Sequence, residues 1–132
     1  MLKVSATAPC PCGSLTEYAA CCGRWHGGEV APTAEALMRS RYVAFVLENE
    51  AYLLTTWHHD KRPESVSFEH SIKWLGLKVV AVNEIGMDTA EVEFVARYRL
   101  GGGSAERLHE RSRFVREAGC WLYVEGKLLA VT

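Results

Sequence analysis

Four of the five cysteines of this chain lie close together near its N-terminus, in the order C-x-C-x8-C-C. They are Cys10, Cys12, Cys21 and Cys22. Four thiolates can complete a tetrahedral shell around Zn²⁺, each about 2.3 Å from the metal. Such a shell leaves no open position for water or substrate, which is typical of structural zinc. The spacing therefore predicts a zinc ion that stabilises the fold and performs no chemistry.

Two alternatives to this site remain open. His26 lies close enough in the sequence to replace Cys22 and give three thiolates and one imidazole. A pair of disulfides would need an oxidising compartment. The residues before Cys10 lack the apolar core of a signal peptide, and no apolar run reaches the length of a transmembrane helix. We therefore expect a cytoplasmic protein with no membrane contact, and zinc in preference to disulfides.

The residues between the two cysteine pairs must bring the pairs together. Gly13 allows a sharp turn because glycine carries no Cβ. Ser14, with Glu17 three residues later, matches a capping box and predicts a short helix over residues 15–20. Neighbouring helical residues point about 100° apart. The adjacent cysteines of the second pair can therefore share one ion only where the helix unwinds.

This stretch resembles the SEC-C motif, which is best known at the C-terminal tail of the motor ATPase of the bacterial preprotein translocase. The match comprises the four cysteines, with Gly13, Ser14 and Tyr18 between them. Leu15 stands where the motif commonly has a second glycine, at a position that is not a ligand. In that ATPase the motif binds zinc and engages the export chaperone and the ribosome. The resemblance therefore implies zinc binding and a protein or ribosomal partner.

Three residues that follow the cysteines are candidates for contact with such a partner: Arg24, Trp25 and His26. Trp25 has two interpretations, either an exposed anchor for the partner or a ring that docks the zinc module on the rest of the chain. The formal net charge of the whole chain is −1. Because no basic field would attract phosphates, we do not expect nucleic-acid binding.

The chain divides at a connection that is rich in glycine and proline. Gly27, Gly28 and Pro32 follow the cysteine-rich part. We therefore expect a zinc module with its linker over residues 1–31 and a second domain over residues 32–132. A chain of 132 residues is long enough for one ordinary domain and a small appendage.

Two helices are expected at the start of the second domain. Thr33 predicts the N-cap of a helix that runs to about Leu47. Asn49 predicts the cap of a second helix that runs to about Trp57. Helical spacing places three residues of the second helix inward: Ala51, Leu54 and Trp57.

From residue 74 onward the apolar pattern changes to that of strands. Strands are expected over residues 74–82, 92–100, 106–116 and 121–124, with a short edge strand over 128–131. Helices followed by an antiparallel meander are typical of an α+β fold. We expect the sheet to curl around the first helix and to leave an open end.

Two charged residues interrupt the apolar faces of these elements. Arg41 lies within the apolar arc of the first helix, and Glu110 shares a strand face with Leu108 and Phe114. Burying either charge without a partner would be costly. Our hypothesis is that Arg41 and Glu110 meet at the open end of the sheet. The alternative for Arg41 is a guanidinium that reaches solvent over the side of the helix.

His58 and Tyr98 complete the candidates for a small-molecule site. His58 is followed by His59 and Asp60, a group that can bind a metal or move protons, although a solvated helix end is the alternative. The fifth cysteine, Cys120, is expected to be a small buried residue inside a strand.

The whole chain is similar to the YchJ-like family of small bacterial proteins. The similarity rests on the cysteine motif and on several further segments: residues 31–42, 52–54, 56–58, 74–77 and 108–114. It implies a SEC-C module followed by a nuclear-transport-factor-2-like (cystatin-like) cone, and it implies no catalytic residues. We predict a zinc-binding adaptor that contacts a protein or ribosomal partner. The alternative is a small-molecule-binding protein, or an enzyme of isomerase or dehydratase type, that uses the cone.

Overall fold

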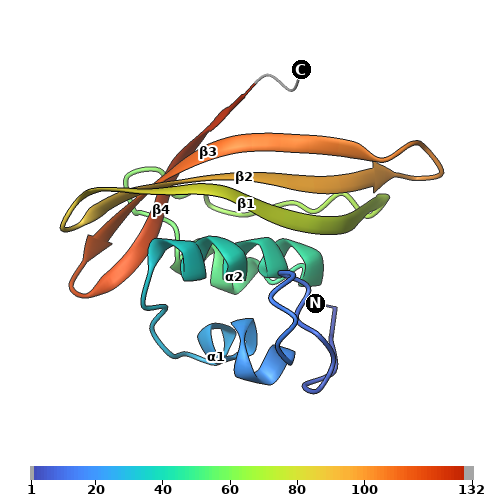
Figure 1. Cartoon of the computed structure of the whole chain (residues 1–132), viewed down its shortest axis with the longest axis horizontal. Helices are drawn as coiled ribbons and strands as arrows, with labels where there is room; N and C mark the ends of the chain where they lie inside the picture. The colour runs from blue at the N-terminus through green and yellow to red at the C-terminus, as the bar shows by residue number, and fades with distance from the viewer. Residues whose placement is uncertain (1, 130–132) are drawn as a thin grey trace.

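The helices precede the strands in the chain, as Figure 1 shows for a computed structural model that describes residues 2–129. The elements in order are the 3₁₀ turn η1 Tyr18–Ala20, the helices α1 Cys22–His26, α2 Ala34–Leu47 and α3 Glu50–Thr55, and the strands β1 Ile72–Gly86, β2 Thr89–Leu100, β3 Glu106–Glu117 and β4 Cys120–Leu128. The predicted α+β order is confirmed. Of the strand expected over residues 128–131, Leu128 is the last residue of β4, and residues 130 and 131 lie outside the described residues. Within the described part, no helix is long and apolar enough to cross a membrane.

The N-caps of α2 and α3 are those that the sequence predicts. The Thr33 side chain accepts a backbone N–H from the first turn of α2 at 3.0 Å. Glu48 ends that helix in the left-handed region, with φ of 56°. Asn49 then accepts a backbone N–H from the first turn of α3 at 3.2 Å. These local hydrogen bonds fix where the chain leaves one helix and enters the next.

The inner face of α3 and of the residues that follow it differs in part from the prediction. Leu53 is fully buried, whereas Ala51 is exposed and Leu54 is partly buried. Trp57 points inward as expected and lines the cavity against the sheet. The helix has only six residues and ends at Thr55. A helix of this length is oriented by the surfaces it packs against, so its own apolar spacing is a weak guide.

The four strands form one antiparallel sheet in the order β1-β2-β3-β4. In Figure 1, α2 lies along one face of this sheet and β4 crosses the longer strands steeply. Along β2, buried residues alternate with partly exposed ones, so that Val92 and Phe94 face α2 while Glu91 and Glu93 face away. The core therefore lies between α2 and one face of the sheet.

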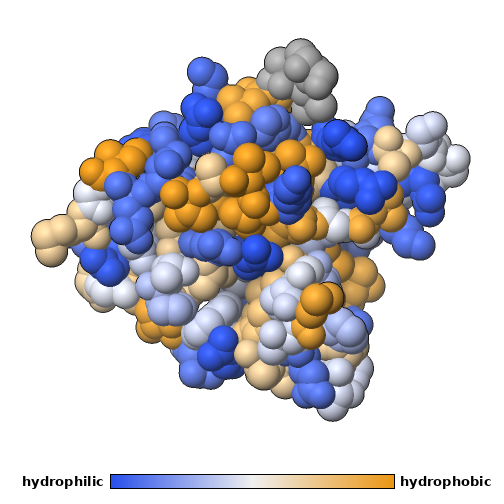
Figure 2. Space-filling model, in the orientation of Figure 1, coloured by the Kyte–Doolittle hydropathy of each residue, from blue (hydrophilic) through white to orange (hydrophobic). Residues whose placement is uncertain are grey.

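The edge strand β1 carries much of the exposed apolar surface. Val80, Val82 and Ile85 are exposed, and Figure 2 shows apolar side chains gathered over the region of the strands. The register of β1 against β2 shifts at three places. Such irregularities interrupt the regular row of backbone groups that an edge would offer to another strand.

Candidate functional site

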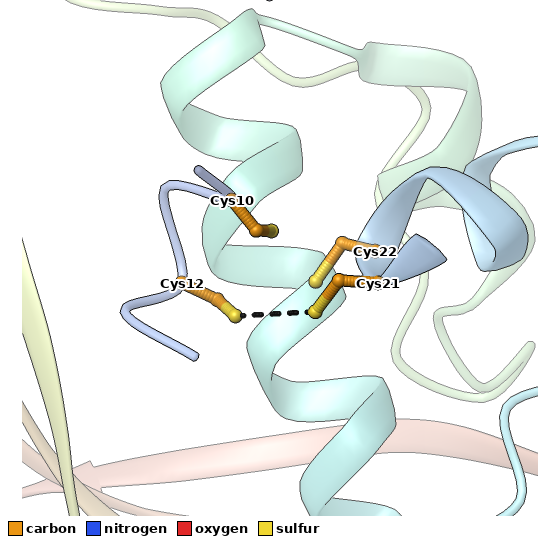
Figure 3. A group of neighbouring side chains, drawn as sticks. All are labelled: Cys10, Cys12, Cys21 and Cys22. Atoms are coloured by element: carbon orange, nitrogen blue, oxygen red, sulfur yellow. Dashed lines mark hydrogen bonds between the residues drawn. The ribbon is translucent and has the colours of Figure 1, made fainter. Parts of the chain in front are cut away.

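The four cysteines of the motif converge on one point. Their Sγ atoms all lie within 4.8 Å of one another, and Figure 3 shows the pair from the N-terminal loop facing the pair at the start of α1. The Sγ atoms of Cys12 and Cys21 are 3.6 Å apart. A tetrahedron with bonds of about 2.3 Å has edges of about 3.8 Å. The spacing therefore fits a single metal ion held by four sulfur atoms.

The loop between the cysteine pairs reaches this geometry by a different route from the predicted one. Gly13 has φ of +85°, so the expected sharp turn is present. The helix expected over residues 15–20 is absent, because Leu15 has φ of +69° and only the turn η1 forms. Ser14 makes no helix cap, and its Oγ lies 3.1 Å from the Sγ of Cys21. The ligand geometry overrides the local capping signal.

The chain is not helical at Cys21, which joins η1 to α1 with φ of −124° and ψ of −117°. This break turns Cys21 and Cys22 toward the same centre. A Cβ at Gly23 would lie 2.7 Å from the backbone oxygen of Tyr18. Only glycine at position 23 therefore allows α1 to approach η1 this closely.

The thiols strongly influence one another's protonation. Hydrogen bonds from Cys10 and Cys22 hold the pKa of Cys12 far below its ordinary value. The hydrogen bond with Cys12 raises the pKa of Cys10 to about 11. Hydrogen bonds with the same neighbours, and then burial, hold the pKa of Cys22 far above the ordinary thiol value. A bound dication would favour the thiolate forms of these ligands.

His26 has both of its ring nitrogens engaged elsewhere. Its Nδ1 accepts a hydrogen bond from the Tyr18 hydroxyl at 2.6 Å, and its Nε2 donates to the backbone oxygen of Ser40 at 2.8 Å. Burial lowers the pKa of His26, which favours the neutral ring. This geometry favours Cys22 as the fourth ligand and makes His26 a link between the module and α2.

Other contacts also dock the module on α2. Arg39 donates to the backbone oxygen of Cys12 at 2.9 Å and is held by Glu35 at 2.8 Å. Trp25 is partly buried against the core, which favours docking over its interpretation as an exposed anchor. Arg24 is exposed and stacks on the Trp25 ring at 4.4 Å.

A second candidate site is a cavity of about 220 Å³ between α2 and the sheet. The lining residues are Met38, Arg41, Tyr42, Phe45, Trp57, Trp74, Phe94, Ala96, Leu108, Glu110, Ser112, Phe114 and Tyr123. The structure thus brings Arg41 and Glu110 to one cavity, although no ion pair joins them within the described residues.

Arg41 is buried, with 5% of its surface exposed, so its guanidinium does not escape to solvent. Its Nη1 donates to the backbone oxygen of Leu53 at 2.8 Å and to the Thr56 hydroxyl at 2.7 Å. The guanidinium carbon lies 4.4 Å from the ring centre of Tyr123 and 5.0 Å from that of Trp57. Burial lowers the pKa of Arg41 to about 10, which leaves it charged at neutral pH.

Glu110 reaches the cavity from β3. The Ser112 hydroxyl donates to Oε2 of Glu110 at 2.6 Å. Ser112 pairs with Gly126 on β4, where a Cβ would overlap the Glu110 carboxylate. The absence of a side chain at Gly126 therefore makes room for the carboxylate. Sequence reasoning missed Gly126 and Tyr123, because their proximity to Glu110 depends on the register of β3 and β4. Alternation along the strand already places Ser112 on the face of Glu110, and helical spacing already turns Trp57 inward; both residues line the cavity.

Two of the predicted pocket residues, His58 and Tyr98, do not line this cavity. His58 is buried and its Nε2 lies 2.8 Å from Oε2 of Glu117. Together with its exposed neighbours His59 and Asp60 it forms a group that could hold a metal ion. Tyr98 packs against Trp74, with ring centres 5.8 Å apart.

Cys120 is exposed at the start of β4, which corrects the expectation of a buried residue. It directly follows the turn at Ala118 and Gly119, where φ is positive at both residues. A residue next to the turn of a hairpin has little structure around it to cover its side chain.

Comparison with protein families gives two matches that together span most of the chain. Residues 33–126 match the family model described as "YchJ, middle NTF2-like domain", and residues 7–24 match the SEC-C motif. A UPF0225 protein of Xanthomonas campestris is 52% identical over 129 residues, covering 96% of this chain and all of the relative. A UPF0225 protein of Polaromonas is 53% identical over 128 residues, covering 90% of this chain and 92% of the relative.

Two solved structures have the same arrangement. The solution structure of a SEC-C motif containing protein from Rhodopseudomonas palustris is 35% identical, with a TM-score of 0.81, and covers 93% of this chain and 100% of that one. The crystal structure of a SEC-C motif containing protein from Psychrobacter arcticus is 28% identical, with a TM-score of 0.78, and covers 96% of this chain and 86% of that one. The similarity therefore extends over the cysteine module and the sheet together.

Proposed function

Because this chain belongs to the YchJ-like family of UPF0225 proteins, we propose that it is a cytoplasmic zinc-binding adaptor whose SEC-C module contacts a protein or ribosomal partner. The observation that carries the proposal is the convergence of four sulfur atoms within 4.8 Å. A shell closed by four protein ligands has no position left for a substrate. The module then acts through its surface and the metal maintains the shape of that surface.

Zinc is the metal that this donor set fits best. Four soft thiolates in tetrahedral arrangement select zinc or an iron–sulfur cluster. The 3.6 Å separation of Cys12 and Cys21 is close to the tetrahedral edge of about 3.8 Å around one zinc ion. Four cysteines would bind it as thiolates, and the buried positions of Cys10, Cys12 and Cys22 would protect the site from solvent.

Two of the exposed residues of the module are the candidates that we favour for contact with a partner. Leu15 is 90% exposed, and its backbone is held in a strained left-handed conformation beside the metal site. Arg24 is exposed and is oriented by stacking on Trp25. His26 contributes by holding the module on α2. Leu15 and Arg24 are therefore the contacts that we propose, with Trp25 as their partly buried support.

Co-sedimentation with purified ribosomes, together with cross-linking in bacterial cytosol, tests the adaptor role. We expect the zinc-loaded wild type to be recovered with a partner and Leu15→Ser to reduce that recovery roughly tenfold, as for a central contact residue. Met87→Ser is the matched control, because Met87 is also apolar and 86% exposed but lies between β1 and β2. A zinc-loaded wild type that engages neither ribosomes nor a protein would refute the proposal. Equal losses for Leu15→Ser and Met87→Ser would refute the assigned contact.

A second candidate function is small-molecule binding in the cone. The observation that favours it is a cavity of about 220 Å³ that contains the buried Arg41 and the carboxylate of Glu110. An isomerase or dehydratase would need a carboxylate and a hydrogen-bond donor in such an apolar setting. Glu110 and Arg41 supply these two groups, whereas His58 and Tyr98 lie outside the cavity.

A further inference from the structure

The cone cavity has a polar cluster within an apolar lining. Arg41 lies beside Tyr123, with its guanidinium carbon 4.4 Å from the ring centre, and the Ser112 hydroxyl donates to Glu110. The rest of the lining is mainly apolar and largely aromatic, and it includes Tyr42, Phe45, Trp74 and Phe94. A ligand that fits this lining has an apolar body and one polar head.

Arg41 retains hydrogen-bonding capacity in this polar cluster. Its Nη1 makes both of its hydrogen bonds, to Leu53 and Thr56. Within residues 2–129, no hydrogen bond occupies its Nη2 or Nε. The indole nitrogen of the neighbouring Trp57 is buried without a hydrogen-bond partner in the described structure. A buried donor without an acceptor is costly, and the guanidinium of Arg41 lies over the same ring, so this side of the cavity favours a ligand that brings an acceptor.

Glu110 offers the complementary group. One of its oxygens, Oε2, accepts the Ser112 hydroxyl, and no hydrogen bond within the described residues occupies Oε1. Gly126 leaves the space in which the carboxylate lies. The cavity thus presents one donor group and one acceptor group that are not paired with each other.

The charges of these groups define the head of the ligand. Arg41 is positive and Glu110 is negative, so their formal charges cancel. An anionic head would be attracted by Arg41 and repelled by Glu110, and a cationic head would meet the reverse. An uncharged amide or lactam places an acceptor beside a donor and is cheaper to remove from water than a charged head.

We propose that the cone binds a small, mainly apolar molecule with an uncharged amide or lactam head, which accepts a hydrogen bond from Arg41 and donates one to Glu110. The cavity of about 220 Å³ has the volume of about seven waters at about 30 Å³ each, so the ligand is small. This ligand class rests on the cone being a binding site and is independent of the adaptor role.

Three probes that share one ring test the head group. Benzamide, benzoate and benzylamine are titrated into the zinc-loaded full chain and followed by protein NMR chemical shifts. We expect benzamide to shift resonances of the cavity residues Ala96, Leu108 and Phe114. Benzoate and benzylamine should bind roughly tenfold more weakly, because each meets one like charge.

Glu110→Gln provides the sharper test, because it removes the negative charge and leaves Arg41 uncompensated. We expect this variant to prefer benzoate over benzamide. Glu93→Gln is the matched control, since Glu93 lies on the opposite face of the sheet with His109 and Arg111, and it should retain the wild-type order. Gly126→Ala should weaken benzamide binding roughly tenfold by displacing the Glu110 carboxylate.

The possible failures are distinguishable. If no probe shifts the cavity resonances of the wild type, the cone is not a site for such ligands. The proposed small-molecule binding and the proposed head group then both fail. If benzoate or benzylamine binds as tightly as benzamide, the site stands and the uncharged head is wrong. If Glu110→Gln does not fold, the wild-type order of the three probes and the response of Gly126→Ala still decide the proposal.

Discussion

At the scale of single residues, Gly23 controls the geometry of the second ligand pair. It follows Cys22, and a Cβ at this position would approach the backbone oxygen of Tyr18 to 2.7 Å. A backbone atom cannot move aside as a flexible side chain can. We therefore assign Gly23 a steric role in bringing the two cysteine pairs together.

Gly23→Ala should weaken zinc binding roughly tenfold and destabilise the protein by about 1–3 kcal/mol, because α1 must shift away from η1. Zinc affinity is measured by competition with a chromophoric chelator, and stability by denaturant unfolding. Gly102→Ala is the control, since a Cβ at Gly102 would meet nothing within 4 Å. If Gly23→Ala bound zinc as the control does, the proposed steric role would be wrong.

Tyr123 makes stability depend on alkaline pH. Burial first, and then the charge of Glu110, raises the pKa of Tyr123 to about 12. In the unfolded chain a tyrosine ionises near pH 10, so the unfolded state loses this proton first. The contribution of Tyr123 is therefore fully present below pH 10 and is lost as the pH rises toward 12.

Tyr123→Phe should reduce the loss of unfolding free energy between pH 10 and pH 12 by about 2 kcal/mol relative to the wild type, because a shift of one pKa unit is worth about 1.4 kcal/mol and each state is half-ionised at one end of this window. Denaturant unfolding at fixed zinc concentration, at several pH values, measures this difference. Equal pH dependence in the two proteins would show that Tyr123 titrates alike in the folded and unfolded states.

At the scale of elements, α1 is joined to α2 by the hydrogen bonds of His26. The imidazole bonds to Tyr18 within the module and to Ser40 on α2, so one side chain fixes the two elements against each other. This role explains why His26 lies close to the cysteines in sequence without facing the metal site.

His26→Phe should retain one zinc ion per chain and lose about 1–2 kcal/mol of stability through the missing hydrogen bonds. Zinc content is measured by atomic emission and stability by denaturant unfolding. Loss of zinc from a variant that still folds would instead identify His26 as a ligand. Retention of zinc with unchanged stability would remove its proposed role as a link.

The sequence predicts elements well where short-range hydrogen bonds define them. Thr33 and Asn49 cap α2 and α3 as expected, because each cap involves residues only a few positions away. The same reasoning is wrong for residues 15–20, where the convergence of the cysteines imposes φ of +69° on Leu15. It also places Ala51 inward, where the structure exposes it, since that short helix is oriented by its packing.

At the scale of the whole molecule, the candidate sites differ in how far the sequence could predict them. The metal site lies within one short segment, so its four cysteines could be named from their spacing. The cavity is lined by elements that are far apart in the sequence, among them α2 and β3. For this site the sequence indicates only that Arg41 and Glu110 interrupt apolar faces. The supporting residues Tyr123 and Gly126 depend on strand register, which alternation alone leaves undefined.

The two sites also occupy different parts of the fold. The module sits on the side of α2 away from the sheet, and the cavity lies between α2 and the sheet (Figure 1). Both depend on α2, which supplies Ser40 to the bond with His26 and Arg41 to the cavity. The proposed partner binding by the module and the proposed ligand binding by the cone would therefore be separable functions on one shared helix.

X-ray absorption at the zinc edge, combined with zinc content, tests the central claim most directly. For protein purified under reducing conditions we predict one zinc per chain with four sulfur neighbours at about 2.3 Å. Cys120→Ser should give the same spectrum, because Cys120 is exposed and lies outside the cluster, whereas Cys22→Ser should lose most of its zinc. A wild-type protein without zinc, or a site with three sulfur atoms and one nitrogen, would contradict the four-thiolate centre.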